Sequence, residues 1–428
     1  MLAKGKSFLF VLVIFTICGS VFAEWLDETI LLSSDPEDED NFGQSVCIDG
    51  NVCVVGAYGV EAYKGAAEIH RFNGADWVRE QRISASDGVS YDRFGYSVDI
   101  DGNVCAVGAY GAGAAYVFRY NGSSWVQEQK LAPSDDPRIF GYVVAIDDDK
   151  CLVGSPTALV DGVTRGAVYS FKCNGSTWVQ EQKLSASDGE FMDQFGEAVS
   201  ISGNLCLIGM PNEDIGASNS GSAYVFEYVG DSWIEQQKLV PSGTINEWHL
   251  FGCSVAIDEN NGSCLIGAKG DDIMADDAGA VYFYKYYSGS WTFFEKLFAP
   301  DATAHNVFGG AVSLLGDIFV VGSSGDDDLG SVCGSAYVFK KDENLRPPWK
   351  IIKLTASDGE YQDYFGTSVS ISGNNALVGA PAGYKDPAIG SAYVYDLTCP
   401  SADLSGDCYV DFRDFATLAE QWLDGIKP

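Results

Sequence analysis

Short runs of alternating apolar and polar residues, separated by glycine-rich turns, cover most of the chain. The second repeat shows the pattern: Tyr96–Ile100 alternates, an Asp-Gly-Asn turn follows, and Val104–Gly108 is almost entirely apolar. Alternation with a period of two is typical of a half-buried strand, and a short apolar run between turns is typical of a buried one. A third run, Ala115–Phe118, and an Asn-Gly hairpin into Trp125–Leu131 complete a unit of four strands.

This unit recurs seven times, and a Phe-Gly pair begins each copy. The pairs start at Phe42, Phe94, Phe140, Phe195, Phe251, Phe308 and Phe365. Four antiparallel strands in about 50 residues, repeated at this spacing, are typical of a β-propeller. We therefore predict an all-β fold, a seven-bladed β-propeller.

The fourth strands indicate how the ring closes. In six units this strand begins with a tryptophan: Trp77, Trp125, Trp178, Trp233, Trp291 and Trp349. The seventh unit, from Phe365, ends after its third strand at Tyr393–Leu397, whereas an extra Trp-led strand, Trp25–Leu32, precedes the first Phe-Gly. We predict that this N-terminal strand joins the last blade, because closure removes two open sheet edges.

The second strands carry a further motif. Val378–Pro381 reads Val-Gly-Ala-Pro, and Gly154–Pro156 and Gly209–Pro211 are variants of it. With the Phe-Gly pairs, these residues resemble the FG-GAP repeat family, which includes the integrin α-subunit propeller and many bacterial secreted proteins. The resemblance covers Trp25 to about Leu397. It implies a propeller used for binding or adhesion.

Integrin-like repeats often hold calcium in an Asp-x-Asp-x-Asp-Gly loop between the first two strands. Here that connection is a short turn such as Asp49–Asn51, and the nearest candidates, Asp147–Asp149 and Asp258–Ser263, do not match. We therefore do not expect integrin-type calcium sites in the blades.

Charge narrows the function classes. The chain has 60 acidic and 26 basic residues, a net charge of −34, which argues against nucleic-acid binding. Many acidic residues fall in the blade-to-blade and second-to-third-strand loops, which chain direction places on one face. The repeated Ser-Asp-Gly segments, and the Asp that stands before some of the Phe-Gly pairs (Asp92, Asp193 and Asp363), favour turn chemistry. For the clusters at 271–277 and 326–328, structural and binding roles stay equally open.

The N-terminus resembles a secretory signal. Lys4 and Lys6 precede the apolar run Phe8–Phe22, and Ala23 offers a small-residue cleavage site. Cys18 raises the alternative of a lipoprotein, but Ile17 occupies the position of the small residue. We predict cleavage after Ala23 and an extracellular protein exported through the Sec pathway. No later apolar run is long enough to span a bilayer.

Cysteines and catalytic motifs add little chemistry. Five second strands carry a cysteine at one position, occupied by Phe319 and Ala376 in the last two units: Cys53, Cys105, Cys151, Cys206 and Cys264. A position that accepts Cys, Phe or Ala is a packed interior site, so we predict buried thiols. A Cys47–Cys53 hairpin bridge is the weaker alternative. The sequence has no Gly-x-Ser-x-Gly, His-Glu-x-x-His or phosphate-binding loop. It nominates no catalytic or cofactor-binding residue.

The C-terminal tail has its own pattern. Positions 1, 3, 5, 9 and 12 of a loop carry side-chain oxygens and position 7 offers a carbonyl, in the order Asp403, Ser405, Asp407, Asp411, Asp414 and Tyr409. This is the layout of an EF-hand-type calcium loop. An amphipathic helix follows, and the segment resembles a single dockerin repeat, which implies calcium and docking to a cohesin-like scaffold. Cys408 stands where glycine is usual, and Cys399 suggests a local disulfide instead.

These observations define three expected parts: a signal peptide over 1–23, a propeller over 24–398 and a dockerin-like repeat over 399–428. We expect a secreted, monomeric binding or adhesion module that recognises an extracellular protein or polysaccharide through its acidic loops, with a calcium-binding tail for attachment. The alternative is a secreted carbohydrate-active enzyme, a glycoside hydrolase or polysaccharide lyase on a propeller scaffold. That alternative rests on association alone, since fold does not fix function.

Overall fold

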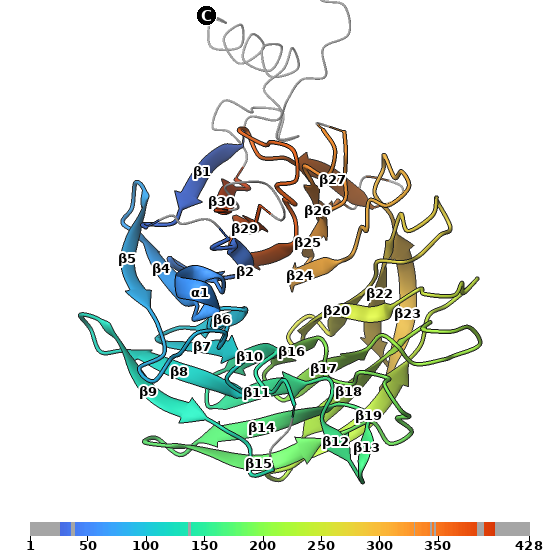
Figure 1. Cartoon of the computed structure of the whole chain (residues 1–428). Helices are drawn as coiled ribbons and strands as arrows, with labels where there is room; N and C mark the ends of the chain where they lie inside the picture. The colour runs from blue at the N-terminus through green and yellow to red at the C-terminus, as the bar shows by residue number, and fades with distance from the viewer. Residues whose placement is uncertain are drawn as a thin grey trace, which may run out of the picture. The chain divides into compact units, whose positions relative to one another are not determined.

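The computed structural model describes residues 26–35, 39–135, 138–328, 330–342, 345, 348–382 and 389–398. Residues Asp27–Leu397 form one compact unit. This unit is a ring of seven four-stranded antiparallel sheets around an axis (Figure 1). The seven-bladed β-propeller is thereby confirmed. Within the described ranges, no helix has the length and apolar character that a bilayer crossing requires.

Each blade follows chain order from the axis outward. Blade 1 contains β2 (Phe42–Asp49), β3 (Val52–Ala57), β4 (Ala66–Phe72) and β5 (Trp77–Ile83), with the one-turn α1 (Val60–Tyr63) between β3 and β4. Blade 2 contains β6 (Ser97–Asp101), β7 (Val104–Ala109), β8 (Ala114–Tyr120) and β9 (Trp125–Leu131). Blade 3 contains β10 (Val143–Asp147), β11 (Lys150–Ser155), β14 (Ala167–Cys173) and β15 (Trp178–Leu184), plus the small hairpin β12 (Leu159–Val160) and β13 (Val163–Thr164).

The second half of the ring repeats the scheme. Blade 4 contains β16 (Val199–Ser202), β17 (Leu205–Met210), β18 (Ser222–Tyr228) and β19 (Trp233–Leu239). Blade 5 contains β20 (Phe251–Asp258), β21 (Ser263–Ala268), β22 (Ala280–Tyr287) and β23 (Ser290–Leu297). Blade 6 contains β24 (Ala311–Leu315), β25 (Ile318–Ser323), β26 (Ser335–Lys341) and β27 (Trp349–Leu354). Blade 7 contains β28 (Ser368–Ser372), β29 (Asn375–Ala380), β30 (Ser391–Asp396) and, from the N-terminus, β1 (Asp27–Leu32).

The ring closes as the sequence predicts. β1 pairs antiparallel with β30, with Asp27 opposite Asp396 and Leu32 opposite Ser391. The strand begins at Asp27, and Trp25, with which the predicted strand begins, lies outside the described residues. Every blade thus has four strands, and the predicted missing strand is supplied from the other end of the chain.

The Phe-Gly pair holds neighbouring blades together. Phe94 is fully buried, and its ring meets Tyr116 and Phe118 edge to face at centroid distances of 5.5 and 5.8 Å. Gly95 has a φ of +90°, and a Cβ there would lie 2.2 Å from the carbonyl oxygen of Ala66 in blade 1. Only glycine permits both that backbone conformation and that approach. The pair therefore combines a core anchor with a close backbone contact between two blades.

An amide clasp links the outer strands. The side chain of Gln81 in blade 1 donates to the carbonyl oxygen of Trp125 in blade 2 and accepts from its backbone N–H, both at 2.8 Å. Gln129, Gln182 and Gln237 repeat the clasp on the tryptophan of the following blade. The glutamine four residues after the outer-strand tryptophan of blades 1 to 4 thus satisfies backbone groups that the outer strand of the next blade would otherwise leave unpaired.

Candidate functional site: the loop face and the axial channel

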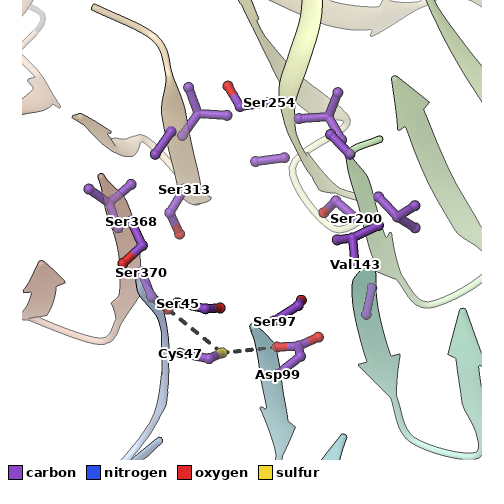
Figure 2. A pocket seen from close by; sticks show the side chains of 18 of the residues that line it. Ser45, Cys47, Ser97, Asp99, Val143, Ser200, Ser254, Ser313, Ser368 and Ser370 are labelled. Carbon is purple, nitrogen blue, oxygen red and sulfur yellow. Dashed lines mark hydrogen bonds between the residues drawn. The ribbon is translucent and has the colours of Figure 1, made fainter. Parts of the chain in front are cut away.

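The first strands of the seven blades line an axial channel with a volume of about 510 Å³. Figure 2 shows serine side chains from several blades around it, together with Cys47 and Asp99. These hydroxyls serve the ring itself. Ser97 accepts the N–H of Val144 at 3.0 Å, and Ser370 accepts the N–H of Ile48 at 3.1 Å, in each case from the next blade. The polar lining therefore satisfies the inner strand edges.

Asp99 carries a carboxylate at a first-strand position where several other blades have a serine. The equivalent residues include Ser200, Ser313 and Ser370. The Asp99 carboxylate accepts the N–H of Ile146 at 2.7 Å and the thiol of Cys47 at 2.9 Å (Figure 2). Burial raises the pKa of Asp99 from 3.8 to about 6. Burial and the neighbouring Asp99 also raise the pKa of the Cys47 thiol well above its usual range, so that thiol is protonated and a poor nucleophile.

Two carboxylates occur among the described channel-lining residues, Asp99 and Glu197. Asp99 stands five residues after its Phe-Gly phenylalanine and Glu197 two residues after its own. Three residues of strand correspond to about 10 Å along the strand. Glycosidic carboxyl pairs are separated by about 5 to 9.5 Å. The two carboxylates therefore do not form an evident catalytic pair.

We call the face formed by the second-to-third-strand loops and the blade connections the loop face, and the opposite one the turn face. Around the loop-face mouth of the channel, tyrosines from blades 1 to 3 make a continuous cluster. Tyr96 contacts Tyr58, Tyr110 and Tyr142 at centroid distances of 5.4, 4.6 and 5.2 Å. The sequence analysis did not select these residues; their signal is the recurrence of tyrosine directly after the Phe-Gly pair and two residues after the second-strand glycine.

Arg93 extends this cluster toward solvent. Its guanidinium lies over the rings of Tyr110 and Tyr63, at 4.9 and 5.9 Å from the centroids, and donates to the Tyr110 hydroxyl. Tyr63 stacks on Tyr91 with an interplanar angle of 7° and a centroid distance of 6.0 Å. Tyr91 itself is 66% exposed. Aromatic and arginine side chains of this kind are enriched at protein interfaces.

The Ser-Asp-Gly aspartates have the structural role that the sequence favours. Asp87 accepts the hydroxyl of Tyr116 at 2.9 Å and the ammonium of Lys130 at 2.6 Å, and the Lys130 hydrogen bond lowers the pKa of Asp87. Asp188 repeats the arrangement with Tyr224 and Lys238. The aspartates before Phe-Gly are also local: Asp92, Asp193 and Asp363 each accept the N–H of the residue three positions earlier.

The two other acidic clusters also contribute structural carboxylates. Asp271 is fully buried, with the Tyr282 hydroxyl at 3.2 Å and the Lys296 ammonium paired to it. Three carboxylates of blade 6, from Asp301, Asp326 and Asp328, lie close enough together to suggest a metal site. The Lys353 ammonium lies 2.7, 2.8 and 2.6 Å from them, so the lysine supplies the positive charge that a metal ion would otherwise provide.

The second-strand cysteines are buried and free, as predicted: Cys53, Cys105, Cys151, Cys206 and Cys264. The alternative Cys47–Cys53 bridge is wrong, because both thiols are free. Burial raises the pKa of these second-strand thiols. They are packing groups of the core.

The predicted signal peptide and calcium loop lie outside the described residues. This applies to all six proposed ligands: Asp403, Ser405, Asp407, Tyr409, Asp411 and Asp414. Their roles stay predictions.

The geometry defines a seven-bladed propeller whose loop face carries a tyrosine and arginine cluster. A sequence model of the FG-GAP repeat matches seven segments that make up more than half of the chain: residues 25–68, 77–118, 125–171, 178–226, 233–284, 291–339 and 350–395. The chain belongs to the FG-GAP repeat family. Integrin alpha-PS3 of Drosophila melanogaster is 30% identical over 164 residues, which are 35% of this chain and 14% of the integrin chain. The match thus spans a small part of that relative's length.

Proposed function

We propose that this protein is an exported binding module of the adhesion type, which recognises an extracellular protein through its loop face. One observation carries the proposal: rigid loops present large side chains to solvent there. Tyr91 and Trp248 are 66% and 60% exposed, and both have positive φ. Their N–H groups donate to the carbonyl oxygens of Ala62 and Ser218 at 3.2 and 2.8 Å. Ordered, exposed aromatic residues lose little conformational entropy when a partner covers them.

The test is a binding screen of the purified chain against extracellular proteins and glycan arrays. The matched variants are Tyr91→Ala and Trp248→Ala on the loop face, with Tyr287→Ala as control, because Tyr287 is 76% exposed at the β22–β23 turn on the opposite face. We expect each loop-face variant to lower the affinity for the captured partner by about tenfold or more, as substitution of aromatic residues at the centre of an interface does. Equal effects of all three variants would refute loop-face recognition, and capture of glycans alone would favour the polysaccharide partner.

The second candidate function is the carbohydrate-active enzyme. The separation of Asp99 and Glu197 gives it no support, but the channel can be tested directly. Degradation of a polysaccharide by the chain, lost in both Asp99→Asn and Glu197→Gln, would establish the enzyme. Activity that survives both substitutions would point to another site or to a contaminant.

The terminal segments complete the proposal. We propose cleavage after Ala23, a propeller over 24–398, and calcium coordination by the loop from Asp403 to Asp414 for attachment to a cohesin-like scaffold. Calorimetric titration of the full chain with calcium, compared with a variant carrying Asp403→Asn and Asp414→Asn, tests the loop. Heat that is unchanged in the variant would place any calcium elsewhere, and the N-terminal sequence of exported protein tests the cleavage.

A further inference from the structure

The residue directly before each Phe-Gly pair has a positive φ in all seven repeats, and in the second repeat this residue is Arg93. The N–H of Arg93 donates to the carbonyl oxygen of Tyr63 in the loop of blade 1 at 2.8 Å, which fixes the backbone here. The side chain therefore extends from a defined point on the loop face. The other six repeats have no cationic residue at this position, which is occupied by Asn41, Ile139, Gln194, Leu250, Val307 and Tyr364.

The guanidinium of Arg93 has one edge without an acceptor. Its Nη1 donates to the hydroxyl of Tyr110, whereas its buried Nε has no hydrogen-bond partner and its Nη2 makes no hydrogen bond to a described residue. Among the described residues the arginine ion pairs are those of Arg71 and Arg119, so Arg93 has none. In Arg71 the same edge, Nε and Nη2, donates to the two carboxylate oxygens of Glu80, both at 3.0 Å. The open edge of Arg93 therefore has the geometry that binds a carboxylate through two hydrogen bonds.

Tyr110 provides a second donor beside this edge. Its hydroxyl accepts the hydrogen bond from Arg93, and its own O–H has no acceptor in the part of the chain that the structure describes. The rings of Tyr63 and Tyr110 flank the guanidinium, and the exposed Tyr91 stacks on Tyr63. The Tyr63 hydroxyl is already bound, because it donates to Glu39 at 2.7 Å. Two neighbouring donors that lack acceptors thus lie between aromatic rings, and such donors are stabilised by a ligand that supplies acceptor oxygens.

The surrounding charge limits what this ligand can be. The chain has a net charge of −34, and the exposed carboxylates of Glu39 and Glu61 lie in the segments next to Tyr63. A polyanion such as an acidic polysaccharide would meet these charges along its length. A single carboxylate needs to contact only Arg93 and Tyr110, and charges more than about 8 Å away are largely screened at physiological ionic strength. The observations therefore favour one acidic side chain of a protein over a polyanionic glycan.

We propose that Arg93 and Tyr110 bind the side-chain carboxylate of an aspartate or glutamate in an extracellular partner protein. Nε and Nη2 of Arg93 donate to the two carboxylate oxygens, and Tyr110 donates its O–H to one of them. The rings of Tyr63 and Tyr91 pack against the apolar atoms next to the carboxylate. Tyrosine and arginine often contribute most of the binding energy of an interface. This inference deepens the proposed loop-face recognition and rests on it for the kind of partner.

The experiment uses small probes, so it does not depend on finding the partner. The full chain is titrated at neutral pH and physiological ionic strength with end-capped Gly-Asp-Gly and Gly-Glu-Gly peptides, and with Gly-Asn-Gly as the neutral match. Glucuronate and sulfate represent the other sources of an anion. The readout is the Nε–H signal of Arg93 in NMR spectra, assigned by Arg93→Lys. Arg93→Gln and Tyr110→Phe remove the donors, and Arg79→Gln, at an exposed position of β5, removes one positive charge elsewhere as the matched control.

We expect saturable binding of the Asp and Glu peptides to wild type and to Arg79→Gln, and none of the Asn peptide. Arg93→Gln should lower the affinity about tenfold or more, because a charge-assisted pair of hydrogen bonds is lost. Tyr110→Phe, which keeps the ring, should lower it several-fold. The proposal is overturned by the absence of a saturable shift, by unchanged affinity in Arg93→Gln, or by tighter binding of glucuronate or sulfate than of the peptides.

The partner captured in the loop-face screen separates this inference from the proposed function. If Tyr91→Ala and Trp248→Ala lower the affinity for that partner and Arg93→Gln does not, loop-face recognition stands and the carboxylate site is overturned. If the peptides bind at Arg93 but Tyr91→Ala, Trp248→Ala and Tyr287→Ala affect the partner equally, loop-face recognition alone is refuted.

Discussion

Asp99 makes the stability of the ring depend on pH in a direction that can be worked out. Its pKa is raised from 3.8 to about 6 by burial. The folded protein therefore holds a proton on this carboxyl at pH values where the unfolded chain has released it. Between about pH 4 and 6 the folded state binds more protons, so the contribution of Asp99 to stability falls as pH rises through that window.

The magnitude follows from the shift. About two pKa units correspond to about 3 kcal/mol, and Asp99 is partly exposed, which reduces the effect, so we expect a loss of about 1 to 3 kcal/mol between pH 4 and pH 8. Asp99→Ser removes the charge but keeps an acceptor, because Ser370 at the equivalent position in blade 7 accepts the N–H of Ile48. Relative to wild type, the variant should be more stable at pH 8 and lose that advantage near pH 4.

The assay is urea unfolding followed by tryptophan fluorescence at pH steps from 4 to 8, with the free energy of unfolding compared at each step. Asp76→Ser, at an exposed turn, controls for the loss of one negative charge from this acidic chain. If the curves of free energy against pH for wild type and Asp99→Ser are parallel, the carboxyl does not carry a raised pKa and the reasoning fails.

Three further outcomes follow from the packing of the blades. Gly111→Ala should destabilise the protein by about 1 to 3 kcal/mol in urea unfolding, because the new Cβ would lie 1.9 Å from the carbonyl oxygen of Tyr91. Tyr224→Phe should cost about 1 kcal/mol, since it removes the hydroxyl that donates to Asp188 at 2.6 Å; an unchanged midpoint would mean that this bond is exchanged for water without cost. The five second-strand thiols should resist iodoacetamide at pH 8 in the folded protein and react fully in urea, as mass spectrometry can count; rapid native labelling would contradict their burial.

The fold could be predicted because each blade repeats the same local pattern. The position of Phe94, for example, recurs in every copy just before an alternating strand. Comparison of the copies also shows that the strand missing after Leu397 is present before Phe42. The site could not be predicted in the same way. Tyr58, Tyr110 and Tyr142 belong to three different blades, and only the radius of the ring brings their side chains together.

The acidic loop clusters illustrate the same limit. The sequence shows which loops carry clustered carboxylates, but it does not show which side chains these carboxylates contact. The sequence could suggest that Asp326 binds a cation. In the folded blade its partner is instead the ammonium of Lys353, which the fourth strand of the same blade places beside it.

Because the N-terminal strand β1 completes blade 7, the ring can close only after the last blade has been synthesised. The hydroxyl of Tyr395 donates to Glu28 across 367 residues of chain at 2.8 Å. Joining ends so far apart costs about 5 kcal/mol of chain entropy, which the β1–β30 ladder and the contacts between blades 7 and 1 together offset. During synthesis six blades can form in order while β1 waits without a partner. Until that pairing forms, the incomplete chain has two exposed strand edges that can pair with each other or with a second chain. The seam that completes the ring is therefore where domain exchange between copies would begin.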